Sequence, residues 1–149
     1  MKLYLHILII LNFLFLNLIF SQEETTKFYI TELRGDISLE MEINNLESNK
    51  GPIYIRILDE NENPVIVGTS PVINYSAEIS FDSISPGKYA IQFFHDENEN
   101  QKMDFNLIGI PKEKFGSSNN VKPVLGPPKF EKMLFNLTED KKIIMIPVN

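Results

Sequence analysis

Apolar and polar residues alternate along several short segments of this chain, and the alternation predicts β-strands. Within 37–43, apolar side chains at every second position are separated by Ser or Glu. The segment 53–57 repeats the pattern with three isoleucines, as expected of strands that bury one face. Further strands are expected at 77–81, 88–94, 133–137 and 143–148, with at most one edge strand at 28–33. No segment shows sustained helical periodicity.

Six or seven short strands separated by frequent turn signals predict an all-β fold, an antiparallel β-sandwich. The segment 79–94 runs through Ser85, Pro86 and Gly87 into a strand that carries Tyr89. It resembles part of the transthyretin-like and carboxypeptidase-regulatory-like sandwiches, which implies an Ig-like or transthyretin-like arrangement. In this turn we expect Gly87 to adopt a positive φ, which glycine adopts at low cost.

One long connection, 104–129, shows little alternation. Its Gly and Pro residues are expected to prevent regular strand pairing along it. Loops of this length in compact domains are usually functional or packed by their own side chains. The simpler alternative is that its apolar residues plug the open end of the sandwich, namely Phe105, Leu107, Ile108, Ile110 and Phe115.

The first 21 residues are expected to direct export. Lys2 precedes an apolar stretch at 3–20, and the small Ser21 is followed by polar residues, which is typical of a secretory signal peptide. An uncleaved anchor helix is the alternative, because the apolar stretch approaches the length that spans a bilayer. The expected organisation is a signal peptide at 1–21, an N-terminal leader at 22–36 and one sandwich domain at 37–149. We expect the mature protein in the periplasm, the cell envelope or the medium.

Composition excludes several classes of function. The net charge of −6 becomes −7 once residues 1–21, with one Lys and no acidic residue, are removed. Without a basic cluster, this charge argues against nucleic acid and anionic membranes as partners. The chain has no Cys, and His95 is the only His after the signal peptide, which excludes thiol chemistry and zinc sites built on Cys or on two His. A pair of His95 with Ser117 or Ser118 is disfavoured, because neither serine has a nucleophile-elbow sequence and His95 is expected at the rim of the core.

The clearest candidate site is the acidic segment that follows the strand at 88–94. Five residues occupy positions 1, 3, 5, 7 and 9 of an EF-hand-like loop: Asp96, Asn98, Asn100, Lys102 and Asp104. Alternate residues of such a loop gather oxygen atoms around calcium, with Lys102 offering its backbone carbonyl. The spacing therefore predicts a structural calcium ion at this loop.

Two positions depart from the EF-hand pattern. Gln101 stands where Gly makes the sharp turn, and Leu107 stands where a bidentate Glu is expected. The missing carboxylate must come from elsewhere or be replaced by water, so affinity is expected in the weak range of about 10⁻⁴–10⁻³ M. The alternative is a solvated tip whose Asp and Asn side chains bond their own backbone. The same pentapeptide recurs at 59–63, where Pro64 follows and a plain acidic turn is expected.

Four motifs between residues 95 and 130 carry a family resemblance. They read His-Asp-Glu-Asn-Glu-Asn at 95–100, Gly-Ile-Pro-Lys-Glu at 109–113, Phe-Gly-Ser-Ser-Asn-Asn at 115–120 and Gly-Pro-Pro-Lys-Phe at 126–130. Together they resemble an uncharacterised bacterial family of secreted proteins, domain of unknown function 2141. The resemblance implies similar Asp and Asn residues in the acidic loop, commonly with Gly in place of Gln101, and implies no established activity.

These observations favour an exported, non-enzymatic module in which the loops at 96–120 form an interaction surface for a protein or glycan ligand. Asn119 and Asn120 are expected to lock the long loop by hydrogen bonds to the backbone. Two other classes stay open: a small hydrolase that uses Asp104, Glu113 or His95, and a structural subunit of an envelope assembly. A hydrolase based on paired carboxylates would need a deep cleft between them.

Overall fold

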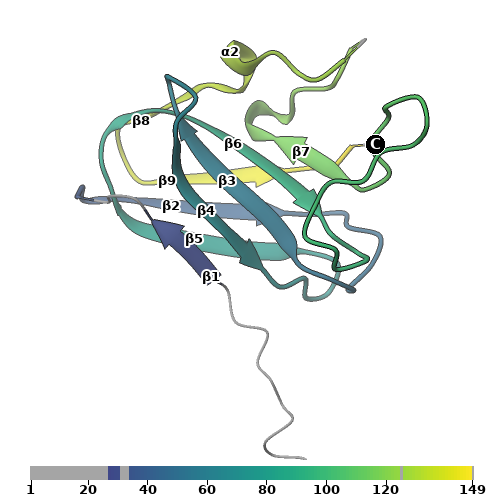
Figure 1. The fold of residues 1–149 in the computed structure, drawn as a ribbon. Helices are drawn as coiled ribbons and strands as arrows, with labels where there is room; N and C mark the ends of the chain where they lie inside the picture. Colours follow the sequence, from purple (N-terminus) through teal and green to yellow (C-terminus); the bar gives the residue numbers. More distant parts are fainter. Residues whose placement is uncertain (1–26, 31–33, 125, 149) are drawn as a thin grey trace, which may run out of the picture.

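The computed structural model describes residues 27–30, 34–124 and 126–148, which pack as two β-sheets. Figure 1 shows the two layers, with the long strands of the larger sheet crossing over those of the smaller one. The β-sandwich fold is thus confirmed. The expected signal peptide, its cleavage after Ser21 and most of the leader lie outside the described residues.

The larger sheet has six strands in the order β1-β4-β3-β6-β7, with β8 also paired to β6. Its strands are β1 (Lys27–Ile30), β3 (Ile53–Asp59), β4 (Pro64–Ser70), β6 (Gly87–His95), β7 (Phe115–Ser117) and β8 (Phe135–Leu137). The smaller sheet has the order β5-β2-β9. Its strands are β2 (Ile37–Ile43), β5 (Ala77–Ile84) and β9 (Lys141–Met145).

The predicted strands at 37–43, 53–57, 77–81 and 88–94 are present as β2, β3, β5 and β6. The described part of the expected edge strand is β1, which pairs only with β4. Strand β4 was not predicted, because it begins at Pro64 and its consecutive apolar residues break the alternation. One pairing also departs from an antiparallel sandwich: β9 runs parallel to β2.

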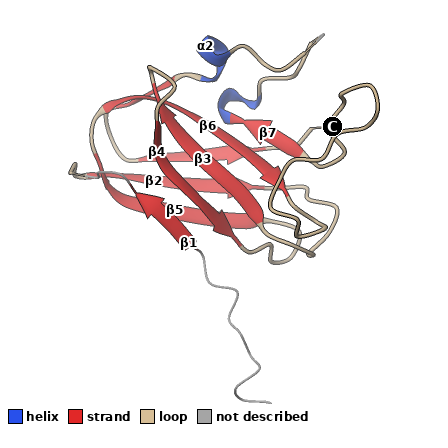
Figure 2. Cartoon of the chain, viewed as in Figure 1, coloured by secondary structure: helices blue, strands red, loops and turns tan. Residues whose placement is uncertain are grey.

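Helical structure in the described chain is confined to two short turns (Figure 2). They are the 3₁₀ turn η1 (Ser118–Asn120) and the four-residue α2 (Phe130–Met133). The segment predicted as a strand at 133–137 is therefore the end of α2 followed by β8. No helix among the described residues is long and apolar enough to cross a membrane.

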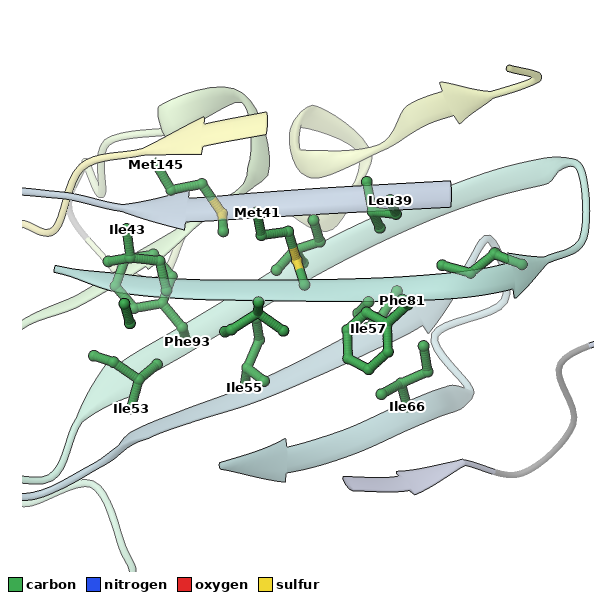
Figure 3. Close-up of a cluster of buried hydrophobic side chains, with 14 of the residues drawn as sticks. Leu39, Met41, Ile43, Ile53, Ile55, Ile57, Ile66, Phe81, Phe93 and Met145 are labelled. Atoms are coloured by element: carbon green, nitrogen blue, oxygen red, sulfur yellow. The ribbon is translucent and has the colours of Figure 1, made fainter. Parts of the chain in front are cut away.

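The core lies between the sheets and is built by the predicted alternation. Figure 3 shows Leu39, Met41 and Ile43 of β2 facing the isoleucines of β3. These side chains are at most 2% exposed, and each buried residue of this size contributes about 1.5–3 kcal/mol relative to exposure. Because the chain has no disulfide, this apolar contact is the main source of stability.

The long connection corrects two expectations. It contains a regular strand, β7, which pairs with β6 although Gly116 lies at its centre. The apolar residues from 105 to 110 do not plug the sandwich, because they are among its most exposed side chains: Phe105 at 56%, Leu107 at 106%, Ile108 at 79% and Ile110 at 48%. These four residues form an apolar lobe on the surface, which reaches beyond the sheets.

The expected positive φ at Gly87 is wrong. Strand β6 begins at this residue, and the glycines with positive φ are Gly51, Gly109 and Gly126 among the described residues. A Cβ atom at Gly87 would lie 3.1 Å from the ring of Tyr89. Any cost of substitution at Gly87 therefore comes from contact with this ring and not from backbone strain.

Polar side chains of η1, of which only Ser118 is buried, tie this turn to its neighbours. Ser118 Oγ donates to Met133 O at 2.6 Å and accepts the amide hydrogen of Ile91 at 3.0 Å. Asn119 Nδ2 donates to the carbonyls of Lys132 and Leu134. Asn120 likewise bonds the backbone of β9 and of the residue after it. The prediction that these asparagines lock the long loop is confirmed.

We expect Ser118→Ala to lower the free energy of unfolding by about 1–3 kcal/mol, because it leaves the buried amide of Ile91 without an acceptor. The exposed Ser80 of β5 is the control, and Ser80→Ala should change it by less than about 0.5 kcal/mol. Urea unfolding of both variants measures the difference. Equal values would show that Ser118 only fills space.

Candidate metal site at the acidic loop

The acidic loop, residues 96–104, leaves the end of β6 and is held against the segment that precedes β3. His95 is fully buried, as its place on the core side of β6 predicts, and its Nε2 lies 2.8 Å from the carbonyl oxygen of Lys50. The amide of Asp96 donates to Pro52 O at 3.0 Å. The start of the acidic loop is therefore fixed by backbone contacts with residues 50–52.

This contact depends on the absence of a side chain at Gly51. The residue has a φ of +68°, and a Cβ built on it would lie 1.9 Å from the carbonyl oxygen of Asp96. No Cβ contact this short occurs in proteins, and the neighbouring atom is rigid backbone. Gly51 thus brings the two chain segments closer than any other residue would allow.

Asp96 is a fully buried carboxylate at the base of the acidic loop. Its oxygens accept the amide hydrogens of Asn100 at 3.1 Å and of Gln101 at 2.7 Å, so the loop folds back over it. Gln101 has a φ of 67°, which is the left-handed conformation that the corresponding Gly supplies in an EF-hand. The backbone therefore makes the expected sharp turn without glycine.

The side chains at positions 3, 5 and 9 converge on one another. Asn98 Nδ2 and Asn100 Nδ2 both donate to Asp104 Oδ2, at 2.7 and 2.9 Å. The amides of Asn100 and Lys102 are bonded by the side-chain oxygens of the Asn two residues earlier. These last two bonds form Asx turns, which are expected both of a calcium-binding loop and of a solvated tip. The residues outside the loop therefore decide between a calcium site and a solvated tip. Lys102 is exposed.

The residue that the sequence analysis did not assign to this site is Glu113. It is only 7% exposed, its Oε2 accepts the amide hydrogen of Asp104 at 3.2 Å, and its Oε1 has no hydrogen-bond partner among the described residues. Lys112 N donates to Asp104 O, which brings the end of the long excursion back to the acidic loop. No EF-hand spacing would identify Glu113, because it lies 17 residues after Asp96.

The electrostatics of Glu113 are unfavourable for an isolated carboxylate. Burial raises the pKa of Glu113 above its usual 4.5, and the nearby carboxylates of Asp96 and Asp104 raise it further, against the opposing effect of the Asp104 amide. Like charges at a buried position need a proton or a cation to offset them. Within the described chain, no three His, Asp or Glu side chains are arranged to hold a metal ion by themselves. A cation here would need amide and backbone oxygens as well.

The repeated pentapeptide is a turn, as expected. Asp59 Oδ1 accepts the amide hydrogens of Asn61 and Asn63 at 2.9 and 2.8 Å and closes the hairpin between β3 and β4. Asn63 Nδ2 also donates to Asp59 Oδ2. This turn reproduces the local bonds of the acidic loop on an exposed tip, and so provides an internal control for it.

The residues considered for catalysis have other partners. His95 Nδ1 lies 3.7 Å from Glu97 Oε1. Ser118 Oγ donates to the carbonyl of Met133 and accepts the amide hydrogen of Ile91. One surface hollow is lined by residues of 44–46, 74–76 and β9 and its extension, and another by residues of β2, β5 and β9. Neither hollow includes Asp104, Glu113 or His95.

A protein-family model described as an uncharacterized protein conserved in bacteria matches residues 41–145. The match runs from β2 to β9 and includes the whole acidic loop and Glu113. No curated protein and no solved structure matches the chain significantly.

We expect Gly51→Ala to cost at least about 3 kcal/mol in free energy of unfolding, since it combines left-handed strain with a backbone clash. Gly109 is the matched control, because it has a φ of +79° and nothing lies within 4 Å of its Cβ position. Gly109→Ala should cost only the strain, about 1–2 kcal/mol. Denaturant unfolding compares the two, and equal costs would contradict the close approach at Asp96.

Proposed function

The chain belongs to DUF2141, a family of uncharacterized proteins conserved in bacteria, and we propose that it is an exported, non-enzymatic β-sandwich module whose acidic loop is ordered by calcium. In this proposal the loops at one end of the sandwich form the surface that binds a partner. The ion has a structural role: it holds the acidic loop and the end of the long excursion together. Export rests on the apolar N-terminal segment and its small Ser21.

The single observation that carries the calcium proposal is the burial of the Glu113 carboxylate beside the carboxylates of Asp96 and Asp104. A solvated tip explains the Asx turns, but it gives no reason to bury a second carboxylate next to the first. Calcium prefers carboxylate and carbonyl oxygens, and an EF-hand takes a bidentate Glu from outside the first nine positions of its loop. Glu113 supplies that carboxylate from a later segment, in place of the residue at Leu107.

The remaining candidate ligands fit the same ion. Asp96 and Asp104 are the two anionic positions of the acidic loop, and the amide oxygens of Asn98 and Asn100 and the carbonyl of Lys102 are neutral. All of these candidate donors are oxygen atoms, which a hard divalent cation prefers, and none is the softer sulfur or imidazole ligand that zinc or copper prefers. A bound cation would also offset the repulsion between Glu113 and its neighbours.

An ion at this position would fix the apolar lobe. The lobe, formed by Phe105, Leu107, Ile108 and Ile110, lies between Asp104 and Glu113 in the chain, and an isolated bridge joins Phe105 to Pro111 at its base. Linking both ends of the lobe to one cation reduces its freedom, and preordering a contact surface lowers the entropic cost of binding. Calcium would thus affect partner binding without contacting the partner.

We expect 10 mM calcium to raise the melting temperature of the purified protein by several degrees. For a Kd of about 0.3 mM, binding to the folded state alone contributes about 2 kcal/mol, a shift that thermal melts resolve. Magnesium should do less, because it demands a smaller octahedral site and releases water reluctantly.

The matched variants for this experiment are Asp96→Asn with Asp104→Asn, and Asp59→Asn in the repeated turn. The double variant should lose the calcium response, whereas Asp59→Asn should keep it, since Asp59 makes similar backbone bonds on an exposed tip. Equal small shifts from calcium and magnesium in all three proteins would indicate general charge screening. That outcome would overturn the proposed ion site.

A separate prediction concerns Glu113→Gln, which removes one charge and keeps the shape. Because the pKa of Glu113 is raised above 4.5 in the folded state, this carboxylate costs stability only above its unfolded pKa, and the cost reaches its full value above the folded pKa. In EDTA, the variant should therefore become more stable than the wild type as the pH rises from 4.5 to 7.

In calcium the order should reverse, because the wild type gains the ion and the variant lacks its third carboxylate. Chemical unfolding at pH 4.5 and 7, with EDTA or calcium, tests both halves. If Glu113→Gln shows the same calcium shift as the wild type, Glu113 is not a ligand.

A further inference from the structure

A hollow of about 510 Å³ lies at the same end of the sandwich as the acidic loop. It is formed where the turns after β2 and before β5, drawn in tan in Figure 2, meet the end of β9 and the residues after it. Its volume falls within the range of small-ligand sites, about 300–1,000 Å³. It is an open depression and contains none of the acidic-loop residues.

Tyr75, on the wall of this hollow, occupies a backbone position that suits glycine. Ile73 and Ser76 form an isolated antiparallel bridge, with both backbone hydrogen bonds present, so Asn74 and Tyr75 are the two central residues of a tight turn. Their φ values are 52° and 61°. Turns with two positive φ values favour Asn-Gly, and a bulky residue at the second position is strained.

Packing does not account for Tyr75. The residue is 55% exposed, and the described contacts that hold it involve its backbone: its amide donates to Asn49 Oδ1 at 2.7 Å and its carbonyl accepts from Leu46 N at 3.1 Å. The structure therefore fixes the backbone of a strained residue and presents the aromatic ring to solvent. Strained positions of this kind concentrate at functional sites.

The chemistry of the lining is uncharged. Asn45, Asn74 and Ser76 contribute amide and hydroxyl groups, Ile144 and Ile146 contribute apolar surface, and no Asp, Glu, Lys or Arg is among the lining residues. Within the described chain the side chains of Asn45 and Asn74 have no hydrogen-bond partner. Each amide offers two donor hydrogens and an acceptor oxygen, which suits the neighbouring hydroxyl groups of a sugar.

We infer that this hollow binds a neutral carbohydrate, with a sugar ring on the face of Tyr75 and its hydroxyl groups bonded to Asn45 and Asn74. An aromatic ring offers a flat apolar surface to the C–H face of a sugar, and a few polar groups then fix its orientation. The absence of charge in the lining selects against acidic and basic ligands.

An extended peptide is a poorer occupant, although β9 is an edge strand beside the hollow. Strand addition requires free backbone groups along the edge. Asn120 already bonds two of them, since its Nδ2 donates to Ile144 O at 3.2 Å and its Oδ1 accepts from Ile146 N at 2.8 Å. The edge is thus capped where a peptide would pair.

This inference extends the proposed binding module but does not depend on calcium. The test is a titration of the purified protein with cellotriose, maltotriose and tri-N-acetylchitotriose, followed by ¹H–¹⁵N NMR in calcium and in EDTA. At least one trisaccharide should shift the amide signals of residues 44–46, 73–76 and 144–146 in both conditions. Signals that move in EDTA support the sugar site even if the calcium proposal fails.

Tyr75→Gly separates the role of the ring from that of the turn. Because it restores the favoured Asn-Gly turn, it should raise the melting temperature while weakening sugar binding by about tenfold or more, as for the loss of a central aromatic contact. Tyr75→Phe should keep the affinity within a few-fold. Tyr29→Ala, at an 81% exposed tyrosine of β1, is the control and should leave binding unchanged.

Two results would overturn the inference. One is the absence of localised shifts with all three trisaccharides. The other is binding that Tyr75→Gly leaves unchanged, which would show that the ring is only tolerated in its turn. In the first case, shifts in the hollow caused by a Val-Thr-Val-Thr peptide would identify it as a peptide site instead.

Discussion

The close approach of Gly51 to the backbone of Asp96 is the contact on which this end of the molecule depends. A Cβ at residue 51 would lie 1.9 Å from a rigid carbonyl oxygen, so the two segments meet only because glycine stands there. The contact buries Asp96, places His95 against Lys50 and sets where the acidic loop starts. A buried carboxylate is costly unless it is bonded, and here the loop itself provides the bonds by folding back over it.

The segment from Asn44 to Pro52 connects the two candidate sites. On one side Asn49 Oδ1 accepts from the amide of Tyr75, and on the other Lys50 and Pro52 bond the start of the acidic loop. An ion pair between Lys114 and Glu47 adds a contact near Glu113. One short segment therefore contacts both the acidic loop and the turn that carries Tyr75.

The sequence predicted the parts of the fold that follow from local alternation. Strands β2, β3, β5 and β6 have one buried face, and their pattern shows it directly. Strand β4 lacks this signal because Val65, Ile66 and Val67 are consecutive, and the parallel pairing of β9 is set by tertiary packing that no local pattern encodes. The turn at Gly87 was misjudged for a similar reason: Pro-Gly is a frequent turn signal, but here the glycine already belongs to the strand.

The spacing of Asp and Asn identified the acidic loop. It did not identify Glu113, the residue that favours an ion site over a solvated tip. Glu113 joins Asp96 and Asp104 only because the chain leaves the sandwich at the apolar lobe and returns, and the spacing of residues in the sequence does not show such a path.

Folded proteins satisfy most local rules and break them chiefly at functional sites. Two of the departures in this chain concern the candidate sites: Glu113 is buried beside the carboxylates of Asp96 and Asp104, and Tyr75 occupies a turn position suited to glycine. Both lie at the end of the sandwich where Gly51 contacts Asp96. The opposite end, where β5 turns into β6, has its own close approach, because a Cβ at Gly35 would lie 2.0 Å from Ile84 O, and Ser83 there has a φ of 71°. The two candidate sites are therefore distinguished by their chemistry, a buried group of carboxylates and an exposed aromatic ring, and not by backbone strain alone.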